Sequence, residues 1–191
     1  MLQAVQLKLW EAAELGDDAE VARCLDVGAD PALANRFGWN ALHRACMSGS
    51  AVCVTRLLLG DENAATPHPL LAKPDGAGNL PLHIAAGCGH RDVVRALLNA
   101  GAAVDAATHK PKEGGGESER STPMHIACRR LSDAPPPKVE PLLDVIVELL
   151  GRGGLLESTD ASDRMAASYL KPPALQLLLA RVRPPQPTDV S

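Results

Sequence analysis

Aromatic residues are scarce in this chain and make up only 2% of its 191 residues. They are Trp10, Phe37, Trp39 and Tyr169. A core with so few aromatic rings has to be built from Ala, Leu and Val packed in thin layers. Basic residues are not in excess either, because the net charge is −4 at pH 7. A non-specific nucleic-acid binder normally shows a basic face, so we expect no nucleic-acid partner.

The sequence also lacks the features of a secreted or membrane protein. It has five cysteines, an odd number without any C-x-x-C pair, which does not indicate a disulfide framework. No basic stretch followed by an apolar run opens the sequence, so no signal peptide is expected. No apolar run reaches the roughly 18 residues of a membrane span. We therefore expect an intracellular protein, cytoplasmic or nuclear, with reduced thiols and no membrane contact.

Two patterns recur along the chain. The first is a six-residue motif, which reads NALHRA from residue 40, LPLHIA from residue 80 and TPMHIA from residue 122. The second is a set of apolar residues at i, i+3 and i+4, which starts at Val21, Val54, Val94, Ile146 and Leu175. This spacing places the apolar residues on one face of a helix. The chain is therefore expected to repeat a unit of two helices about five times.

The motif T-P-L-H-x-A at a period of about 33 residues is the signature of ankyrin repeats. The chain resembles this family from about Leu7 to Arg183. The resemblance implies an all-α solenoid of about five helix-turn-helix units with β-hairpin-like fingers, the two outer units being degenerate caps. We expect one domain over residues 1–183 and a Pro-rich flexible tail over 184–191. The expected units are 4–35, 36–72, 73–107, 108–159 and 160–183.

The residues at the helix ends explain why the motif has this form. Thr122 and Asn40 can each cap a helix N-terminus, and the proline after Thr122 occupies the first helical position, where no N–H is needed. Leu80 has no capping group, so the helix after it should start more weakly. Three glycines are placed to end the second helices in the left-handed region, namely Gly28, Gly101 and Gly153.

The apolar stripes of the second helices are unevenly spaced, which predicts insertions. Consecutive stripes begin 33, 40, 52 and 29 residues apart. The extra residues are assigned to loops at 62–73, 108–117 and 132–141. Loops inserted in a solenoid often carry its function. The run Pro135–Pro137 in the third loop is interpreted either as a rigid spacer or as a polyproline II ligand for an SH3 or WW domain.

Two H-x-x-C pairs could suggest a metal site, because His and Cys three residues apart share a helix face. The pairs are His43 with Cys46 and His125 with Cys128. They lie in units two and four, with a whole repeat between them, so we expect no metal. The family resemblance instead implies a structural role for His43, His83 and His125, which would hydrogen-bond the backbone of a neighbouring hairpin.

No arrangement of residues indicates catalysis. The glycine run 114–116 lacks the Lys and the strand–loop–helix context of a phosphate-binding loop. There is no G-x-S-x-G nucleophile motif. We therefore expect neither enzymatic activity nor a cofactor.

The best candidate for a binding site is the finger at residues 35–40. By the family pattern, Arg36, Phe37 and Trp39 fall at the three variable positions whose side chains usually project outward from the tip of the finger. This finger holds half of the chain's aromatic residues beside an arginine, and Trp and Arg are enriched among interface hot spots. The alternative is that Phe37 or Trp39 folds back over the helices. With Arg44 and Met47 on the next helix, these residues form the expected partner-binding set.

The predicted function is that of a non-enzymatic interaction module or scaffold. It would be monomeric by itself and would bind another protein through its finger tips and concave helical face. One alternative is a regulatory subunit that modulates an enzyme or a transcription factor. A nucleic-acid binder is a further alternative, which the acidic balance disfavours.

Overall fold

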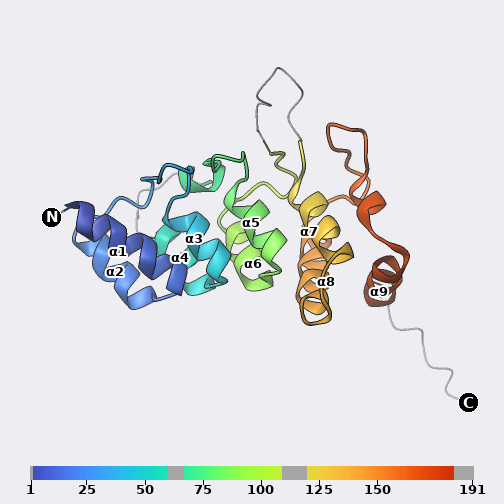
Figure 1. Cartoon of the computed structure of the whole chain (residues 1–191), viewed down its shortest axis with the longest axis horizontal. Coiled ribbons are helices and arrows are strands. Elements are labelled where there is room, and N and C mark those ends of the chain that lie inside the picture. The colour runs from blue at the N-terminus through green and yellow to red at the C-terminus, as the bar shows by residue number, and fades with distance from the viewer. Residues whose placement is uncertain (1, 60–66, 109–119, 183–191) are drawn as a thin grey trace, which may run out of the picture.

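A computed structural model describes residues 2–59, 67–108 and 120–182. Its helix pairs stack side by side in one row (Figure 1). Four helix pairs are formed by α1 (Leu2–Leu15) and α2 (Asp18–Asp26), α3 (Ala41–Ser48) and α4 (Ala51–Leu59), α5 (Pro81–Cys88) and α6 (Arg91–Asn99), and α7 (Pro123–Ser132) and α8 (Pro136–Gly151). In these ranges the β pairing is limited to a bridge between Thr159 and Met165. The predicted all-α repeat fold is confirmed. No described helix is both long and apolar enough to cross a membrane.

The core is a thin layer between two rows of helices. The first helices α1, α3, α5 and α7 contact one another in succession, and so do the second helices α2, α4, α6 and α8. One large apolar residue of each first helix is at most 2% exposed, namely Leu9, Leu42, Leu82 and Met124. The small residues that follow, such as Ala85 and Ala86, are fully buried. Small side chains let neighbouring helices approach closely, as the low aromatic content predicts.

The helix starts differ as their capping residues predict. The Oδ1 of Asn40 accepts a hydrogen bond from the His43 amide at 3.0 Å, and the Oγ1 of Thr122 accepts one from the His125 amide at 3.5 Å. Leu80 makes no such side-chain bond. At all three starts the motif histidine compensates, because its Nδ1 accepts a hydrogen bond from the amide of the capping residue.

Glycine ends the first helices where the next unit approaches closely. Gly49 follows α3 with a φ of +82°, and a Cβ there would lie 2.7 Å from the His90 ring. The Nε2 of His90 lies 3.1 Å from the carbonyl oxygen of Met47, which joins units two and three. The glycines predicted after the second helices also adopt left-handed φ values, +92° at Gly28, +94° at Gly101 and +88° at Gly153.

The first two predicted insertions are only partly described. Residues 60–66 and 109–119 lie outside the described ranges, and the expected loops 62–73 and 108–117 overlap them. The rest of the first insertion contains a short 3-10 helix, η1 (Pro69–Ala72), which buries Leu70 and Leu71. This stretch therefore adds apolar side chains to the core.

The prediction of a loop at residues 132–141 is wrong. Helix α8 begins inside that segment and runs for 16 residues, so only residues 133–135 separate it from α7. Pro136 and Pro137 occupy the first helical positions, where a missing N–H leaves no bond unmade. The insertion therefore lengthens α8, and these two prolines are not in the polyproline II conformation.

The fifth unit lacks a full first helix. A 3-10 helix, η2 (Ala166–Tyr169), takes its place and is followed by α9 (Pro172–Val182). The predicted apolar stripe of α9 is partly wrong, because Leu178 is buried but Leu175 is 38% and Leu179 is 52% exposed. The buried face of α9 is formed by Ala174 and Leu178, four residues apart, so it is rotated away from Leu175 and Leu179. The expected tail at 184–191 lies outside the described residues.

Candidate functional site

The finger at residues 35–40, here finger two, is a turn held by one side chain. The Oδ1 of Asn35 accepts hydrogen bonds from the amides of Phe37 at 2.9 Å and Trp39 at 3.0 Å. The next finger, residues 75–80 or finger three, touches it, since the Gly76 amide donates to the carbonyl oxygen of Phe37 at 2.8 Å. The backbone that carries the candidate residues is therefore fixed from within and by its neighbour.

The two aromatic residues of finger two lie in different environments. Phe37 is 59% exposed, and the guanidinium of Arg36 lies 4.7 Å from its ring centroid. Trp39 is half-buried, and its ring centroid lies 6.1 Å from that of His43 at the start of α3. Phe37 and Arg36 thus form an exposed stacked pair, while Trp39 covers the beginning of the helix.

The other two predicted contact residues lie on α3, on the solvent-facing side of the first helices. This side, the first-helix face, has Glu11, Met47, Cys88, Arg129 and Arg130 among its exposed residues. Met47 is 39% exposed and lies almost two turns beyond the start of α3. The Arg44 side chain is 21% exposed, pairs with Glu14 of α1 and lies 5.8 Å from the ring centroid of Trp10. The five predicted residues therefore extend along one unit and do not form a pocket.

The motif histidines lie between consecutive units. The Nε2 of His83 is 2.9 Å from the carbonyl oxygen of Ser121 in unit four. The Nε2 of His125 is 3.2 Å from the carbonyl oxygen of Arg164 in unit five. His43 is fully buried, and its Nε2 has no hydrogen-bond partner among the described residues. Two of the three rings thus connect a first helix to the finger that follows it.

These rings are held in the neutral form. Burial lowers the pKa of all three, and lowers that of His83 to about 4. The hydrogen bond at Nδ1 of His83, which accepts from the Leu80 amide at 3.2 Å, also favours the neutral ring, whereas the bond to the Ser121 carbonyl opposes the shift and raises the pKa. A protonated ring would present a second donor to that amide. The histidines are therefore suited to fixing backbone and not to exchanging protons near pH 7.

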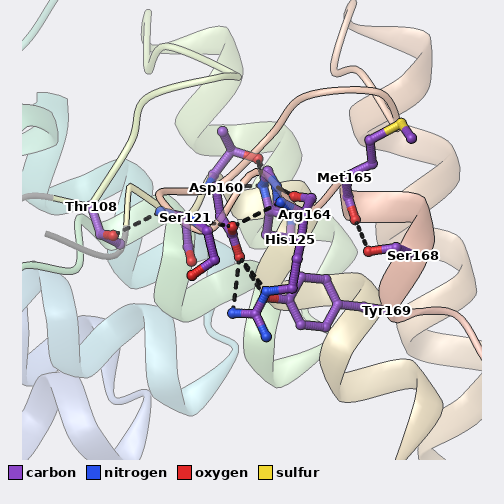
Figure 2. Close-up of polar contacts among 10 residues, drawn as sticks. Thr108, Ser121, His125, Asp160, Arg164, Met165, Ser168 and Tyr169 are labelled. Atoms are coloured by element: carbon purple, nitrogen blue, oxygen red, sulfur yellow. Dashed lines mark hydrogen bonds and ion pairs between the residues drawn. The ribbon is translucent and has the colours of Figure 1, made fainter. Parts of the chain in front are cut away.

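A network around Asp160, which the sequence analysis did not identify, holds the finger at residues 160–165, here finger five (Figure 2). The Asp160 carboxylate is buried and accepts hydrogen bonds from the Tyr169 hydroxyl at 2.5 Å and from Nε of Arg164 at 3.2 Å. Burial alone would raise its pKa, but the bonds from Tyr169 and from the amides of Arg164 and Ser162 lower the pKa to about 2. The ring of Tyr169 also meets His125 edge-on, with centroids 6.2 Å apart.

The sequence contains a signal for this network that was missed. Finger five reads DASDRM from residue 160 and follows the pattern of finger three, DGAGNL from residue 75. The Oδ1 of Asp75 and the Oδ1 of Asp160 each accept two amide hydrogen bonds in the same positions. Asp163 takes the glycine position and has a φ of +55°. Because Asp163 replaces the glycine of the finger pattern, the similarity between finger five and finger three was not recognised.

The thiols of the H-x-x-C pairs are neutral. Cys46 and Cys128 are fully buried and unpaired, and burial raises the pKa of Cys128 to about 12. A metal binds the thiolate form, which burial disfavours here. Across the described ranges, no three His, Cys, Asp or Glu side chains are grouped as a metal site would require.

Comparison with known families agrees with this architecture. A family model described as ankyrin repeats (3 copies) matches residues 9–108. The match covers more than half of the chain and runs from the middle of α1 to beyond the end of α6. Ankyrin repeats are generally protein–protein interaction modules and are typically not enzymes. On the repeated helix pairs, the fingers and this match, the chain belongs to the ankyrin-repeat family.

Proposed function

We propose that this chain binds a partner protein through finger two and the adjoining first-helix face, without catalysing a reaction. The observation that carries the proposal is the exposed stack of Phe37 and Arg36. Phe37 is 59% exposed on a finger whose backbone is already fixed. A fixed aromatic side chain loses little conformational freedom on binding, which favours its use as an interface anchor.

The remaining residues of the predicted set have secondary parts in this proposal. Trp39 is half-buried and supports the finger from behind, so only its exposed edge is available to a partner. Arg44 fixes α3 to α1 through Glu14. Met47 offers a flexible apolar side chain on the same face, of a kind that adapts to different partners.

The test compares Phe37→Ala with Val52→Ala, a matched control. Val52 is 58% exposed but lies on α4, in the second row of helices. Partner proteins captured from source-cell extract by the wild-type chain are identified, and their affinity for each variant is measured. We expect Phe37→Ala to weaken binding by about 2 kcal/mol, or nearly thirty-fold, and Val52→Ala to leave it unchanged. Equal affinities for both variants would remove Phe37 from the interface.

A second variant, Trp39→Ala, separates binding from stability. Because Trp39 is half-buried, its truncation should lower the melting temperature as well as the affinity. Phe37→Ala should change the affinity alone. If the affinity of the folded Trp39→Ala protein equals that of wild type, Trp39 only supports the finger.

A further inference from the structure

Two arginines on α7 stand out because their charges are not neutralised. Arg129 and Arg130 are exposed in the last turn of α7, and neither forms an ion pair with any residue in the described ranges. By contrast, every described arginine of α2, α4, α6 and α9 is in an ion pair. The second helices thus use their arginines within the fold, while α7 leaves two cations facing solvent.

Carboxylates near these two arginines are already bound by other groups. Arg129 acts electrostatically on Tyr169, and the Asp160 carboxylate on that side is paired with Arg164 and accepts the Tyr169 hydroxyl. Neither α5 nor α7 contains Asp or Glu. Arg130 and Lys138 both lie close enough to Cys88 to act electrostatically on its thiol. The acidic residue next along the chain, Asp133, pairs with Lys171 at 2.5 Å. The dipole of α7 favours cations at Arg129 and Arg130, which lie in its last turn, whereas Lys138 lies in the first turn of α8, where the dipole disfavours a cation.

An apolar strip lies beside these cations. Ile84 of α5 and Ile126 of α7 are both half-buried, and the two helices are in contact. Gly87 presents no side chain between them, and a Cβ there would lie 3.0 Å from Cγ2 of Ile126. The position of Gly87 in α5 corresponds to Met47 in α3 and to Arg129 in α7. A ligand that crosses from α5 to α7 would therefore meet apolar surface first and two guanidinium groups next.

We propose that the first-helix face of α5 and α7 binds an acidic peptide segment of the partner protein, with its carboxylates on Arg129 and Arg130 and an apolar side chain beside Gly87. This inference rests on the proposed function and names the chemistry of the partner. Guanidinium groups bind carboxylates through paired, charge-assisted hydrogen bonds. A nucleic acid is a less suitable ligand than an acidic peptide. The first unit, residues 4–35, holds seven acidic and only two basic residues and would repel phosphates.

The test uses defined probes and the full chain. The probes are short fluorescein-labelled peptides of the repeats Leu-Glu-Glu-Leu and Leu-Lys-Lys-Leu, together with a labelled double-stranded DNA. The variant is Arg129→Glu/Arg130→Glu, and its control is Arg23→Glu/Arg56→Glu, which changes the net charge equally on the second helices. Arg129→Gln/Arg130→Gln removes the charges without adding negative ones. Thermal unfolding confirms that each variant is folded.

We expect the wild-type chain to bind the glutamate peptide more tightly than the lysine peptide or the DNA. Affinity should fall by about tenfold or more in Arg129→Glu/Arg130→Glu and less in the glutamine variant. In the control it should change by less than about twofold, because long-range charge effects are screened at physiological salt. Equal losses in variant and control, tighter binding of the DNA or the lysine peptide, or no glutamate-peptide binding at about 1 mM would overturn the inference.

The two proposals can fail separately. If Arg129→Glu/Arg130→Glu keeps full affinity for the captured partner while Phe37→Ala loses it, the interaction function stands and the acidic-peptide site is wrong. If the glutamate peptide binds as expected while Phe37→Ala has no effect on the partner, the site on α5 and α7 stands and the role of finger two is wrong.

Discussion

Units two and three and units four and five all stack on their neighbours, but they end their helices and build their helix pairs with different residues. In the middle of the chain, glycine ends both first helices, at Gly49 and Gly89, and each helix pair is short and regular. Towards the C-terminus, α7 ends at Ser132 and is followed by Asp133 in place of a glycine, and α8 is 16 residues long. The first helix of unit five is reduced to the 3-10 helix η2.

The difference shows what a repeat can lose and still stack. In the middle, stacking depends on close contact between small residues of neighbouring helices. In unit five, η2 still packs against α7 with Ala166 fully buried, and side-chain hydrogen bonds add to this contact. The Tyr169 hydroxyl donates to Asp160, and the Ser132 hydroxyl of α7 donates to the Tyr169 carbonyl oxygen. The hydrogen bond from a motif histidine to the next finger joins unit three to unit four and unit four to unit five. His43 of unit two makes no such bond among the described residues, so this bond belongs to the later interfaces.

Acidification should produce the largest effect and should act through His83 and Asp160 in different pH windows. The folded pKa of His83 is about 4, below the value of about 6.5 in an unfolded chain. Its contribution to the free energy of unfolding is therefore complete above about pH 6.5 and is lost as pH falls towards 4. The loss amounts to about 3 kcal/mol, at about 1.36 kcal/mol per pH unit. Asp160, with a folded pKa of about 2, loses its contribution only below about pH 4.

Denaturant unfolding of wild type and His83→Gln across this pH range measures the effect. The variant should be less stable at pH 7 and should show a shallower decline between about pH 6.5 and 4. Below pH 4 the two curves should run parallel, because Asp160 is unchanged. An identical slope in both proteins between pH 6.5 and 4 would contradict the role given to His83.

Overpacking the middle of the array should have the next largest effect. Ala85 is fully buried between α5 and its neighbours, so Ala85→Leu should lower the free energy of unfolding by about 1–3 kcal/mol. The matched change Ala180→Leu, at an exposed position of α9, should stay within about 0.5 kcal/mol of wild type. Chemical denaturation of both variants checks this. Equal effects would show that close packing is not confined to the regular units.

Replacing the buried carboxylate of finger five should cost more than the same change in finger three. Finger two already uses Asn35 at this position, so Asp75→Asn should be nearly neutral. Asp160→Asn should lower stability by about 1–2 kcal/mol, because an amide nitrogen then faces the donors of Tyr169 or Arg164. Thermal melts of the two variants give the comparison. A larger loss for Asp75→Asn would mean that the Tyr169 network adds nothing.

The smallest effect is expected from making finger five more regular. Asp163 has a φ of +55° where finger two has Gly38 and finger three has Gly78. Asp163→Gly should raise stability by up to about 1 kcal/mol, since the left-handed conformation costs a non-glycine residue about 1–2 kcal/mol. The greater freedom of glycine in the unfolded chain offsets part of this gain. A clear loss of stability would indicate that the Asp163 side chain makes a stabilising contact.

Much of the fold could be predicted because its signals are local. Helix starts at Asn40 and Thr122 and the glycine ends depend on hydrogen bonds within a few residues. The insertion at residues 132–141 was misassigned because its proline run was interpreted as a spacer or a polyproline II ligand, although the first turn of a helix accepts proline. The position of finger two in the repeat could be predicted, but not which of its aromatic side chains is exposed.

The sequence by itself determined that this is a repeat of helix pairs with a thin aliphatic core, because apolar spacing and capping residues repeat with the unit. Only the tertiary structure decided that Phe37 faces solvent while Trp39 lies against His43. It also decided that Asp160 meets Tyr169 and that Arg129 and Arg130 remain unpaired within the described ranges. Each of these outcomes depends on which side chains of neighbouring units fall within contact distance. The stacking of the units sets these contacts between units, and the sequence pattern within a single unit carries no information about them.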